Sequence, residues 1–365
     1  MIIISMSRQQ FNSIELFAGA GGMFLGFENV GFKNILCVEF DKNAVQTLKL
    51  NRPKLNVICD DIRNINFAKL DCINEINHID LLSGGIPCQS FSYSGQKHGL
   101  NDTKGSMFYE FCRAIKELSK IKNNNKSTHK PKIILIENVK GMLTHDNGKT
   151  FKIICRELAA LGYDIKYEIL NANDYNVAQK RQRLIIIGVD KKYSSDANLQ
   201  FNYPKPNDYK PVLRDAFKNL KEYNKYSEDE FVKYPKNKYE IMKRIPQGGS
   251  WVDLPLKLQK SYLGKSYDTE GGKRGIARRL SMSEPSLTLT TSPMQKQTER
   301  CHPSETRPLS VHEYAAIQSF PSDWVFCGSK MAKYRQIGNA VPVNLAEAVG
   351  HELIKLLKKI RKYDA

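Results

Sequence analysis

The fold is decided by the stretch Phe17-Ala18-Gly19-Ala20-Gly21-Gly22, near the start of the chain. It follows an apolar run from Asn12 to Phe17 that predicts a buried strand. Glycines at the end of such a strand let the backbone turn sharply and approach a ligand before a helix begins. The stretch therefore predicts the first strand, loop and helix of an α/β sheet with a ligand at its edge.

Outward from this stretch, short apolar runs alternate with amphipathic segments from about residue 12 to residue 190. This alternation is typical of a parallel sheet covered by helices and predicts a Rossmann-like α/β fold. Six further strands are expected at Ile35 to Glu39, Val57 to Cys59, Ile79 to Ser83, Ile133 to Glu137, Asp164 to Asn171 and Arg183 to Val189.

The rest of the chain divides into two parts of different character. Between residues 191 and 305 Lys, Tyr, Pro and Gly dominate and the periodicity fades, which indicates a smaller, irregular domain. Regular pattern returns after Arg307 and ends in a helix with an apolar face of Leu345, Val349, Leu353, Leu356 and Ile360. We therefore expect a first domain of residues 1–190, a second of residues 191–305 and a C-terminal segment of residues 306–365.

The composition limits the class of protein. Lys and Arg number 56 against 38 Asp and Glu, and the net charge of +18 favours a polyanionic partner, although a solvated Lys-rich surface gives the same balance. The eight cysteines include no CxxC pair, so neither disulfides nor a metal site are expected. No apolar run approaches the roughly 18 residues of a membrane span, and the opening run is too short for a signal sequence. We expect a monomeric, cytoplasmic protein.

The glycine loop and the next strand together indicate a nucleoside cofactor. The glycine order is not GxGxxG, which argues against a dinucleotide and is compatible with S-adenosylmethionine. Glu39 follows the glycines by about 20 residues, where an acidic side chain suits hydrogen bonding to ribose hydroxyls. Asp61, after the third strand, suits either the adenine amino group or the cap of a following helix. The loop alone is also compatible with a tight structural turn.

A candidate nucleophile follows the fourth expected strand, in Gly84-Gly85-Ile86-Pro87-Cys88-Gln89-Ser90. A lone cysteine is usually a small buried hydrophobe. Cys88 differs because it lies at the sheet edge where α/β proteins bind ligands, after glycines and a proline that shape a rigid turn. A thiol held there can be exposed and become a thiolate.

Five runs of the chain, in this order and with family-like spacing, resemble the DNA cytosine carbon-5 methyltransferase family of the bacterial restriction-modification type. They are Phe17-Ala18-Gly19-Ala20-Gly21-Gly22, Gly84-Gly85-Ile86-Pro87-Cys88-Gln89-Ser90-Phe91-Ser92, Glu137-Asn138-Val139, Gln179-Lys180-Arg181-Gln182-Arg183 and Gln336-Ile337-Gly338-Asn339-Ala340-Val341-Pro342. The resemblance covers nearly the whole chain. It implies a Rossmann-like S-adenosylmethionine-dependent methyltransferase fold with a target-recognition domain at residues 191–305.

The resemblance also implies a catalytic set, which is Cys88, Glu137, Arg183 and Arg181. Carbon 5 of cytosine is a poor nucleophile, so the Cys88 thiolate is expected to attack carbon 6 first. Glu137 is then the acid at ring nitrogen 3 and Arg183 the cation at the carbonyl oxygen. The target base must be flipped out, because carbon 6 is unreachable within the stack. Taken singly, Glu137 is also explained as a helix cap and the arginines as solvated charges.

The remaining matched residues are assigned to substrate and cofactor. Gln89, Ser90 and Asn138 are expected to hold the base, and Arg181 the base or its phosphates. The methyl donor is S-adenosylmethionine, which leaves S-adenosylhomocysteine, and no metal takes part. The cofactor residues are expected to be Phe17, Ala18, Gly19, Gly21, Gly22, Glu39, Phe40, Asp61, Ile62, Pro87, Asn339 and Val341.

The second domain has the composition expected for contacts with duplex DNA. Basic and aromatic side chains are interleaved there, and they can supply phosphate contacts and base-edge donors or form a solvated basic face. They are Lys243, Arg244, Lys265, Lys273, Arg274, Arg278 and Arg279, with Trp251, Tyr262 and Tyr267. The chain departs from the family pattern at His312, Ala316 and Lys104, where arginines are common, and we expect weaker packing of the recognition domain there.

Two alternatives to a DNA methyltransferase stay open from the sequence. A tRNA cytosine-5 methyltransferase shares the catalytic set, but the long stretch between Arg183 and Arg307 favours DNA. A catalytically silent DNA-binding relative would keep the fold without the reaction. A nicotinamide-dependent oxidoreductase would leave Cys88, Glu137 and Arg183 without a role. A cognate restriction endonuclease acting separately is compatible with the sequence, as is a solitary enzyme associated with the nucleoid.

Overall fold

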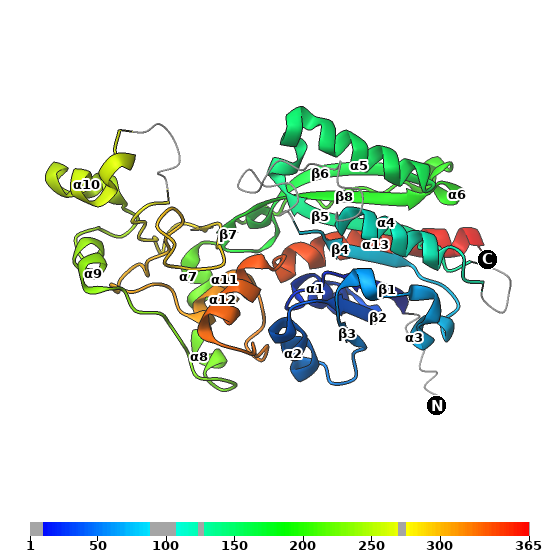
Figure 1. Cartoon of the computed structure of the whole chain (residues 1–365), viewed down its shortest axis with the longest axis horizontal. Helices are drawn as coiled ribbons and strands as arrows, with labels where there is room; N and C mark the ends of the chain where they lie inside the picture. Colours follow the sequence, from blue (N-terminus) through cyan, green and yellow to red (C-terminus); the bar gives the residue numbers. More distant parts are fainter. Residues whose placement is uncertain (1–9, 88–106, 123–127, 269–274, 365) are drawn as a thin grey trace.

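The computed structural model describes residues 10–87, 107–122, 128–268 and 275–364 (Figure 1). Its centre is a seven-stranded sheet in the order β3-β2-β1-β4-β5-β8-β6. The strands are β1 (Phe11–Leu16), β2 (Phe32–Glu39), β3 (Val57–Cys59), β4 (Leu81–Gly85), β5 (Ile133–Val139), β6 (Tyr163–Asn171) and β8 (Gln182–Asp190). All seven strands expected from the sequence are present.

Strand β8 departs from the parallel arrangement that the alternation predicted. Neighbouring strands from β3 to β5 are parallel, but β8 runs antiparallel to both β5 and β6. Only residues 172–181 connect β6 to β8, and these are too few for the crossover that parallel neighbours need. The start of β8 therefore lies at the same edge as the ends of β4 and β5, and Arg183 pairs with Val139.

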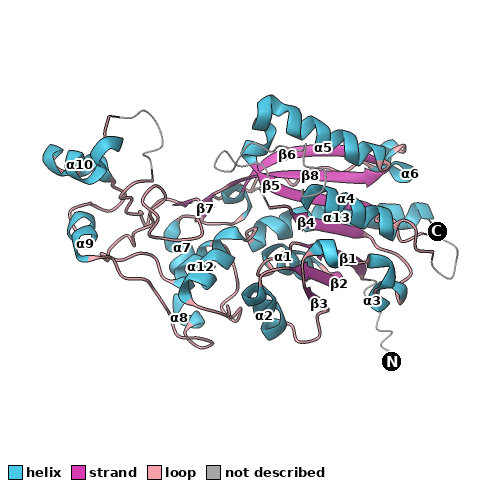
Figure 2. Cartoon of the chain, viewed as in Figure 1, coloured by secondary structure: helices cyan, strands magenta, loops and turns pink. Residues whose placement is uncertain are grey.

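Helices cover both faces of the sheet because its strands carry apolar side chains on both sides (Figure 2). Ile134 and Ile136 of β5 face a core shared with α4 (Met107–Leu118) and α5 (Lys149–Ala160). Ile133 and Leu135 face the opposite core, shared with α1 (Gly22–Val30) and α13 (Val343–Asp364). The remaining helices of the sheet domain are α2 (Lys42–Asn51), α3 (Asp71–Asn74) and α6 (Lys191–Ser194).

Residues 191–305 are mostly irregular. The first of them pack on the sheet domain, with Tyr193, Leu199 and Phe201 in its core, and the part after about residue 210 projects from one end of it (Figure 1). Their elements after α6 are α7 (Leu213–Phe217), α8 (Leu220–Tyr223), α9 (Lys236–Met242), α10 (Leu256–Leu263) and β9 (Ser286–Leu287), which pairs with β7 (Gln179–Lys180). A small core of their own joins Met242, Ile245, Leu254, Leu263, Ile276, Ala277 and Cys301. We call residues 191–305 the recognition region.

Arg279 was expected among the DNA contacts, but its side chain is buried inside the recognition region. Its guanidinium donates hydrogen bonds to the carbonyl oxygens of Met242, Ile245, His302 and Glu305. Irregular backbone leaves buried carbonyls without helix or sheet partners, and a guanidinium offers five donors to satisfy them. The assignment of Arg279 to phosphates or bases is therefore wrong.

The last part of the chain returns to the glycine loop through α11 (Val311–Ile317), α12 (Lys330–Asn339) and α13. A Cβ on Gly22 would lie 2.2 Å from the carbonyl oxygen of Val341, so only glycine permits this approach. The predicted apolar face of the last helix is confirmed, since all five of its residues are buried. Among the described residues, no helix is long and apolar enough to cross a membrane.

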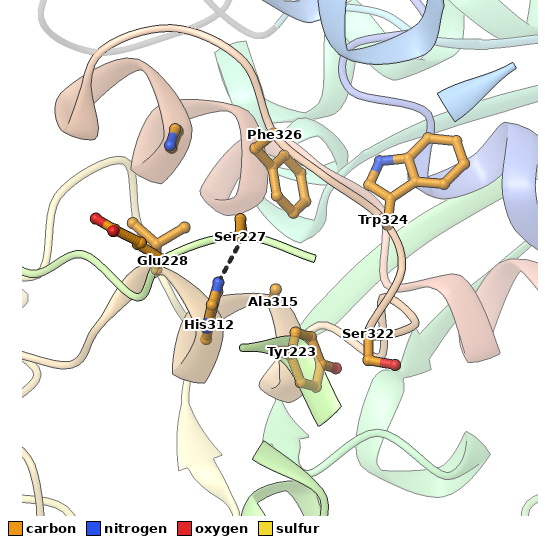
Figure 3. Close-up of a pocket in the computed structure, with 10 residues that line it drawn as sticks. Tyr223, Ser227, Glu228, His312, Ala315, Ser322, Trp324 and Phe326 are labelled. Carbon is orange, nitrogen blue, oxygen red and sulfur yellow. Dashed lines mark hydrogen bonds between the residues drawn. The ribbon is translucent and has the colours of Figure 1, made fainter. Parts of the chain in front are cut away.

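The weaker packing expected at His312 is not seen. Figure 3 shows the ring of His312 pointing to Ser227 in a small cavity whose wall includes Trp324 and Phe326. Nε2 of His312 lies 2.9 Å from the Ser227 hydroxyl, and Nδ1 lies 3.1 Å from the side-chain oxygen of Asn224. The imidazole therefore joins α11 to the segment after α8, and the position stays packed without an arginine. Lys104 lies outside the described residues.

Stability is expected to depend on pH through two buried histidines. Burial lowers the pKa of His302 and of His312, so the unfolded chain binds their protons more tightly than the folded protein does. Their contribution to stability is complete above about pH 6.5 and is lost as the pH falls below it. His312→Gln removes one titrating ring, and the fall in unfolding free energy should become shallower by at most about 1.4 kcal/mol per pH unit. Urea denaturation at several pH values measures this slope, and an unchanged slope would contradict the assignment.

Candidate functional site

Most of the predicted site residues converge on the carboxyl edge of the parallel strands. Phe17 follows β1, Glu39 ends β2 and Glu137 lies near the end of β5. The antiparallel direction of β8 brings Arg183 to the same edge. Ligands of open α/β sheets bind at this edge, so the fold places the residues where the sequence predicted a site.

Glu137 and Arg183 form an ion pair across β5 and β8. Nε of Arg183 lies 2.8 Å from Oε1 of Glu137, and the side chains are only 12% and 11% exposed. A Cβ on Gly85 would lie 3.4 Å from the other carboxylate oxygen, Oε2, so the pair also borders the end of β4. A charged acceptor and donor thus lie side by side next to the strand that leads to Cys88. Cys88, Gln89 and Ser90 themselves lie outside the described residues.

Asn138 is used within the protein. Its side-chain amide is buried, donates to the carbonyl oxygen of Ile86 at 3.0 Å and accepts a hydrogen bond from the backbone of Val139 at 2.8 Å. Ile86 immediately precedes Pro87, so the amide ties the end of β5 to the turn after β4. We expect Asn138 to position this turn, in place of the contact with the base that the sequence suggested.

Arg181 is also buried, with 1% of its surface exposed. Its guanidinium donates to the carbonyl oxygens of Leu289, Gly338 and Ala340. Burial lowers its pKa well below the usual value for arginine, and the charge of Arg183 acts in the same direction. The structure therefore does not support the contact of Arg181 with the base or its phosphates that the sequence suggested.

Left-handed backbone angles and hydrogen bonds to Glu39 fix the conformation of the glycine loop. Phe17, Gly19 and Gly21 have φ angles of 57°, 54° and 87°, the left-handed region that strains a bulky residue such as Phe17. The Glu39 carboxylate accepts a hydrogen bond from Gly19 N at 2.7 Å and another from Asp41 N at 2.7 Å. Each carboxylate oxygen keeps a second lone pair, so Glu39 can hold the loop and still accept a hydrogen bond from a hydroxyl group.

The other predicted cofactor residues surround this loop with different exposures. Phe40 is 74% exposed, which is unusual for a large aromatic ring beside a binding loop. The Asp61 carboxylate accepts a hydrogen bond from Nε of Arg63 at 2.9 Å, and this bond lowers the pKa of Asp61. Of four further residues expected at the cofactor, Ile62 and Val341 are buried, whereas Pro87 and Asn339 are exposed.

Glu15 is a residue that the sequence analysis missed. It lies within β1, directly before Leu16 and the loop, with 1% of its surface exposed, and its Oε2 has no hydrogen-bond partner among the described residues. Burial raises its pKa well above the usual value, and Glu39 adds to the effect. A buried carboxylate oxygen without a partner is costly, and a nearby cationic group would lower that cost. The available signal was an acidic residue inside an apolar strand.

A family model described as C-5 cytosine-specific DNA methylase matches residues 11–355. The chain belongs to this DNA methylase family. The methylase is 47% identical to Type II methyltransferase M.Sau96I of Staphylococcus aureus, over 96% of this chain and 77% of that protein. It is 49% identical to Type II methyltransferase M.PspPI of Psychrobacter sp., over 97% of this chain and 81% of that protein.

Solved structures share the fold of this DNA methylase. A putative DNA modification methyltransferase encoded within an E. coli prophage aligns with a TM-score of 0.65 and 23% identity, over 96% of this chain and all of that one. The S. pombe Dnmt2 methyltransferase aligns with a TM-score of 0.58 and 18% identity, over 96% and 99%. The Rossmann-like methyltransferase fold and the family resemblance read from the sequence are thereby confirmed. This methylase transfers a methyl group to carbon 5 of cytosine in DNA.

Phe40 supplies a prediction about cofactor binding. An exposed aromatic ring beside Glu39 can stack on a purine, a contact worth about 1–3 kcal/mol. Phe40→Ala should therefore weaken binding of S-adenosylhomocysteine about 5- to 150-fold in calorimetry. Phe40→Trp is the matched control and should bind within about threefold of wild type, because it retains the stacking surface. Equal affinity of the Ala variant and wild type would remove Phe40 from the site.

Proposed function

We propose that this DNA methylase modifies one cytosine within a specific sequence of duplex DNA, through a covalent bond between Cys88 and carbon 6 of a flipped-out base. The observation that carries the proposal is the Glu137–Arg183 ion pair. It lies beside the end of β4, and the chain continues from there through Pro87 to Cys88. The carboxyl group and the guanidinium thus lie beside the segment that leads to the proposed nucleophile, where a pyrimidine ring would be activated.

The proposed steps follow from the electronic needs of cytosine. The Cys88 thiolate adds to carbon 6, and the electron pair of the 5,6 double bond moves into the ring and makes carbon 5 nucleophilic. Glu137 holds a proton at ring nitrogen 3, and Arg183 stabilises the negative charge on the carbonyl oxygen. After carbon 5 has accepted the methyl group, its proton leaves to a base, the double bond re-forms and the Cys88 thiolate is expelled.

S-adenosylmethionine, when bound, supplies an electrophilic methyl group on a positively charged sulfur. The residues at the glycine loop fit this cofactor: Glu39 would accept hydrogen bonds from the ribose hydroxyls, and Phe40 would stack on the adenine. The buried Glu15 carboxyl, whose Oε2 has no hydrogen-bond partner among the described residues, suits the positive charge that the cofactor carries. Asp61 would accept a hydrogen bond from the adenine amino group, in competition with the one from Arg63. S-adenosylhomocysteine is the expected product, and no metal is required.

Duplex DNA is proposed to lie against the recognition region. Lys243, Arg244 and Lys265 are exposed there and can neutralise phosphates, and Arg278 is partly exposed. Tyr267 packs edge-on against Trp251, and Lys260 lies over the Tyr267 ring. Lys273 and Arg274 lie outside the described residues. We further propose that the methylase acts as a monomer on DNA of the nucleoid, separately from any cognate restriction endonuclease.

Methyl transfer to defined nucleic acids tests the proposal. Bisulfite sequencing of DNA from cells expressing the methylase should reveal protected cytosines in one sequence context. In vitro, labelled methyl groups should enter duplex DNA that contains this context and should not enter tRNA. Transfer to tRNA alone would overturn the substrate, and methylation spread over unrelated contexts would overturn the sequence specificity.

A further inference from the structure

Three fully buried polar side chains, Gln179, Arg181 and Gln318, form a cluster where the recognition region meets the catalytic sheet. Nε2 of Gln179 donates to Oε1 of Gln318 at 2.9 Å. Oε1 of Gln179 accepts a hydrogen bond from Leu289 N at 2.9 Å. Gln318 donates in turn to the carbonyl oxygens of Ile337 and Ala340. We call these three side chains the junction cluster.

Arg181 is the member that joins the recognition region to the C-terminal segment. Nη1 donates to the carbonyl oxygen of Leu289 at 3.0 Å, and Nη2 donates to those of Gly338 and Ala340 at 2.8 and 3.1 Å. The two segments also touch directly, since a Cβ on Gly338 would lie 2.3 Å from the carbonyl oxygen of Thr290. One guanidinium therefore fixes two backbone segments that are distant in sequence.

Each segment that meets at Arg181 leads to a different part of the function. Leu289 follows β9 and belongs to the recognition region. Ala340 precedes Val341, whose carbonyl oxygen packs on Gly22 of the glycine loop. Arg181 itself lies two residues before Arg183, the partner of Glu137. The Arg181 side chain thus connects the segments to which we assign recognition of the target, binding of the cofactor and activation of the base.

Because the Arg181 guanidinium is buried, its hydrogen bonds resist relative movement of the segments that it joins. A buried guanidinium needs carbonyl partners, and moving any one segment would leave a charged donor or a carbonyl unsatisfied at a cost of about 1–3 kcal/mol or more. Lysine cannot replace it, because an ammonium group is a compact donor that lacks the planar fork spanning both segments. Small displacements of residues 286–290 are therefore transmitted to the strand that carries Arg183.

We propose that Arg181 is a positioning residue that couples correct docking of DNA on the recognition region to the alignment of the Glu137–Arg183 pair and the glycine loop. The proposal rests on the proposed function. Without the link, DNA and cofactor still bind, but the bound cytosine meets a misaligned pair. The kcat on the cognate sequence then falls, and the ratio of kcat/KM between the cognate sequence and altered sequences decreases.

Arg181→Lys tests this role, with Arg279→Lys as the matched control. Arg279 is buried as well, but among the described residues its guanidinium donates to Met242, Ile245, His302, Glu305 and Thr306, all outside residues 286–290. Thermal unfolding should show that both variants lose stability. For Arg181→Lys alone, kcat should fall about 10- to 100-fold, as expected for a misplacement of about 1 Å, while KM for DNA changes less than about threefold. The ratio of kcat/KM between the cognate duplex and a duplex with one altered base pair should fall as well.

Three outcomes are distinguishable in this experiment. If wild type transfers no methyl group to DNA, the proposed function fails before the coupling is tested. If wild type is active and folded Arg181→Lys keeps its kcat and its discrimination, the coupling is overturned. If Arg181→Lys does not fold, Gln179→Ala removes a neighbouring link of the same cluster, and it should show the same loss of kcat on a smaller scale; wild-type kcat and discrimination in that variant would equally overturn the coupling.

Discussion

Cys88→Ala should abolish methyl transfer while leaving the binding of duplex DNA and cofactor intact. Removal of the nucleophile of a covalent mechanism typically lowers kcat by about 10⁴-fold or more, because the remaining groups cannot raise the electron density at carbon 5. Labelled-methyl transfer measures the loss, and fluorescence anisotropy with a labelled duplex measures the binding. Cys72→Ala replaces a half-buried thiol on α3 and serves as the control, with kcat expected within about twofold of wild type.

A trapping experiment tests the role of Cys88 without a measurement of kcat. A cognate duplex with 5-fluorocytosine at the target cannot lose a proton from carbon 5, so the bond between Cys88 and carbon 6 persists after methyl transfer. Wild type should therefore form a complex with this duplex that survives a denaturing gel, and Cys88→Ala should form none. A stable complex with the Ala variant would place the nucleophile elsewhere.

Glu137→Gln should give the second largest loss of activity. Glutamine keeps the size of the side chain but cannot hold or release a proton at ring nitrogen 3, and loss of general acid catalysis costs about 10²- to 10⁴-fold in kcat. The KM values for DNA and cofactor should change far less, because the lost interaction belongs to the transition state. Glu168→Gln, on the exposed part of β6, is the matched control and should leave kcat unchanged.

The ion pair adds a test of the shared role of Glu137 and Arg183. Because the two side chains contact each other, their effects on kcat should not be additive, and Glu137→Gln with Arg183→Ala should cost less than the product of the single losses. Single-turnover rates with saturating DNA provide this comparison. Strict additivity would mean that the two groups act in separate steps, and a Glu137→Gln rate within threefold of wild type would remove Glu137 from the chemistry.

The sequence predicted every strand of the sheet but not the direction of β8. Apolar runs fix which residues are buried, and this is why the runs at Ile133 and Arg183 gave correct strands. The same runs contain no information on strand direction. Only the short connection of residues 172–181 indicated the reversal, and the length of a loop is a weaker signal than a run of apolar residues.

The position of a candidate site residue could be predicted only where the residue lies near the end of a strand in the amino-acid sequence. The glycine loop follows β1, and Glu39 and Glu137 lie at or near the ends of β2 and β5, so their place could be read from local pattern. The burial of Arg181 depends on Leu289 and Gly338, which are remote in the chain, and no local pattern reports such contacts. Glu15 was missed, and the hydrogen bond from Asn138 to Ile86 was not foreseen, for a related reason, since both features depend on neighbouring strands.

The contact between Gly22 and Val341 also bears on when the methylase becomes active during its synthesis. A ribosome delivers Gly22 of the glycine loop long before Val341, the residue that packs on it. At a rate of about 5–20 residues per second, the recognition region emerges well before the catalytic half is completed. A nascent chain that has not yet reached Val341 therefore lacks a finished cofactor loop, and methyl transfer is expected only after that residue has been synthesised.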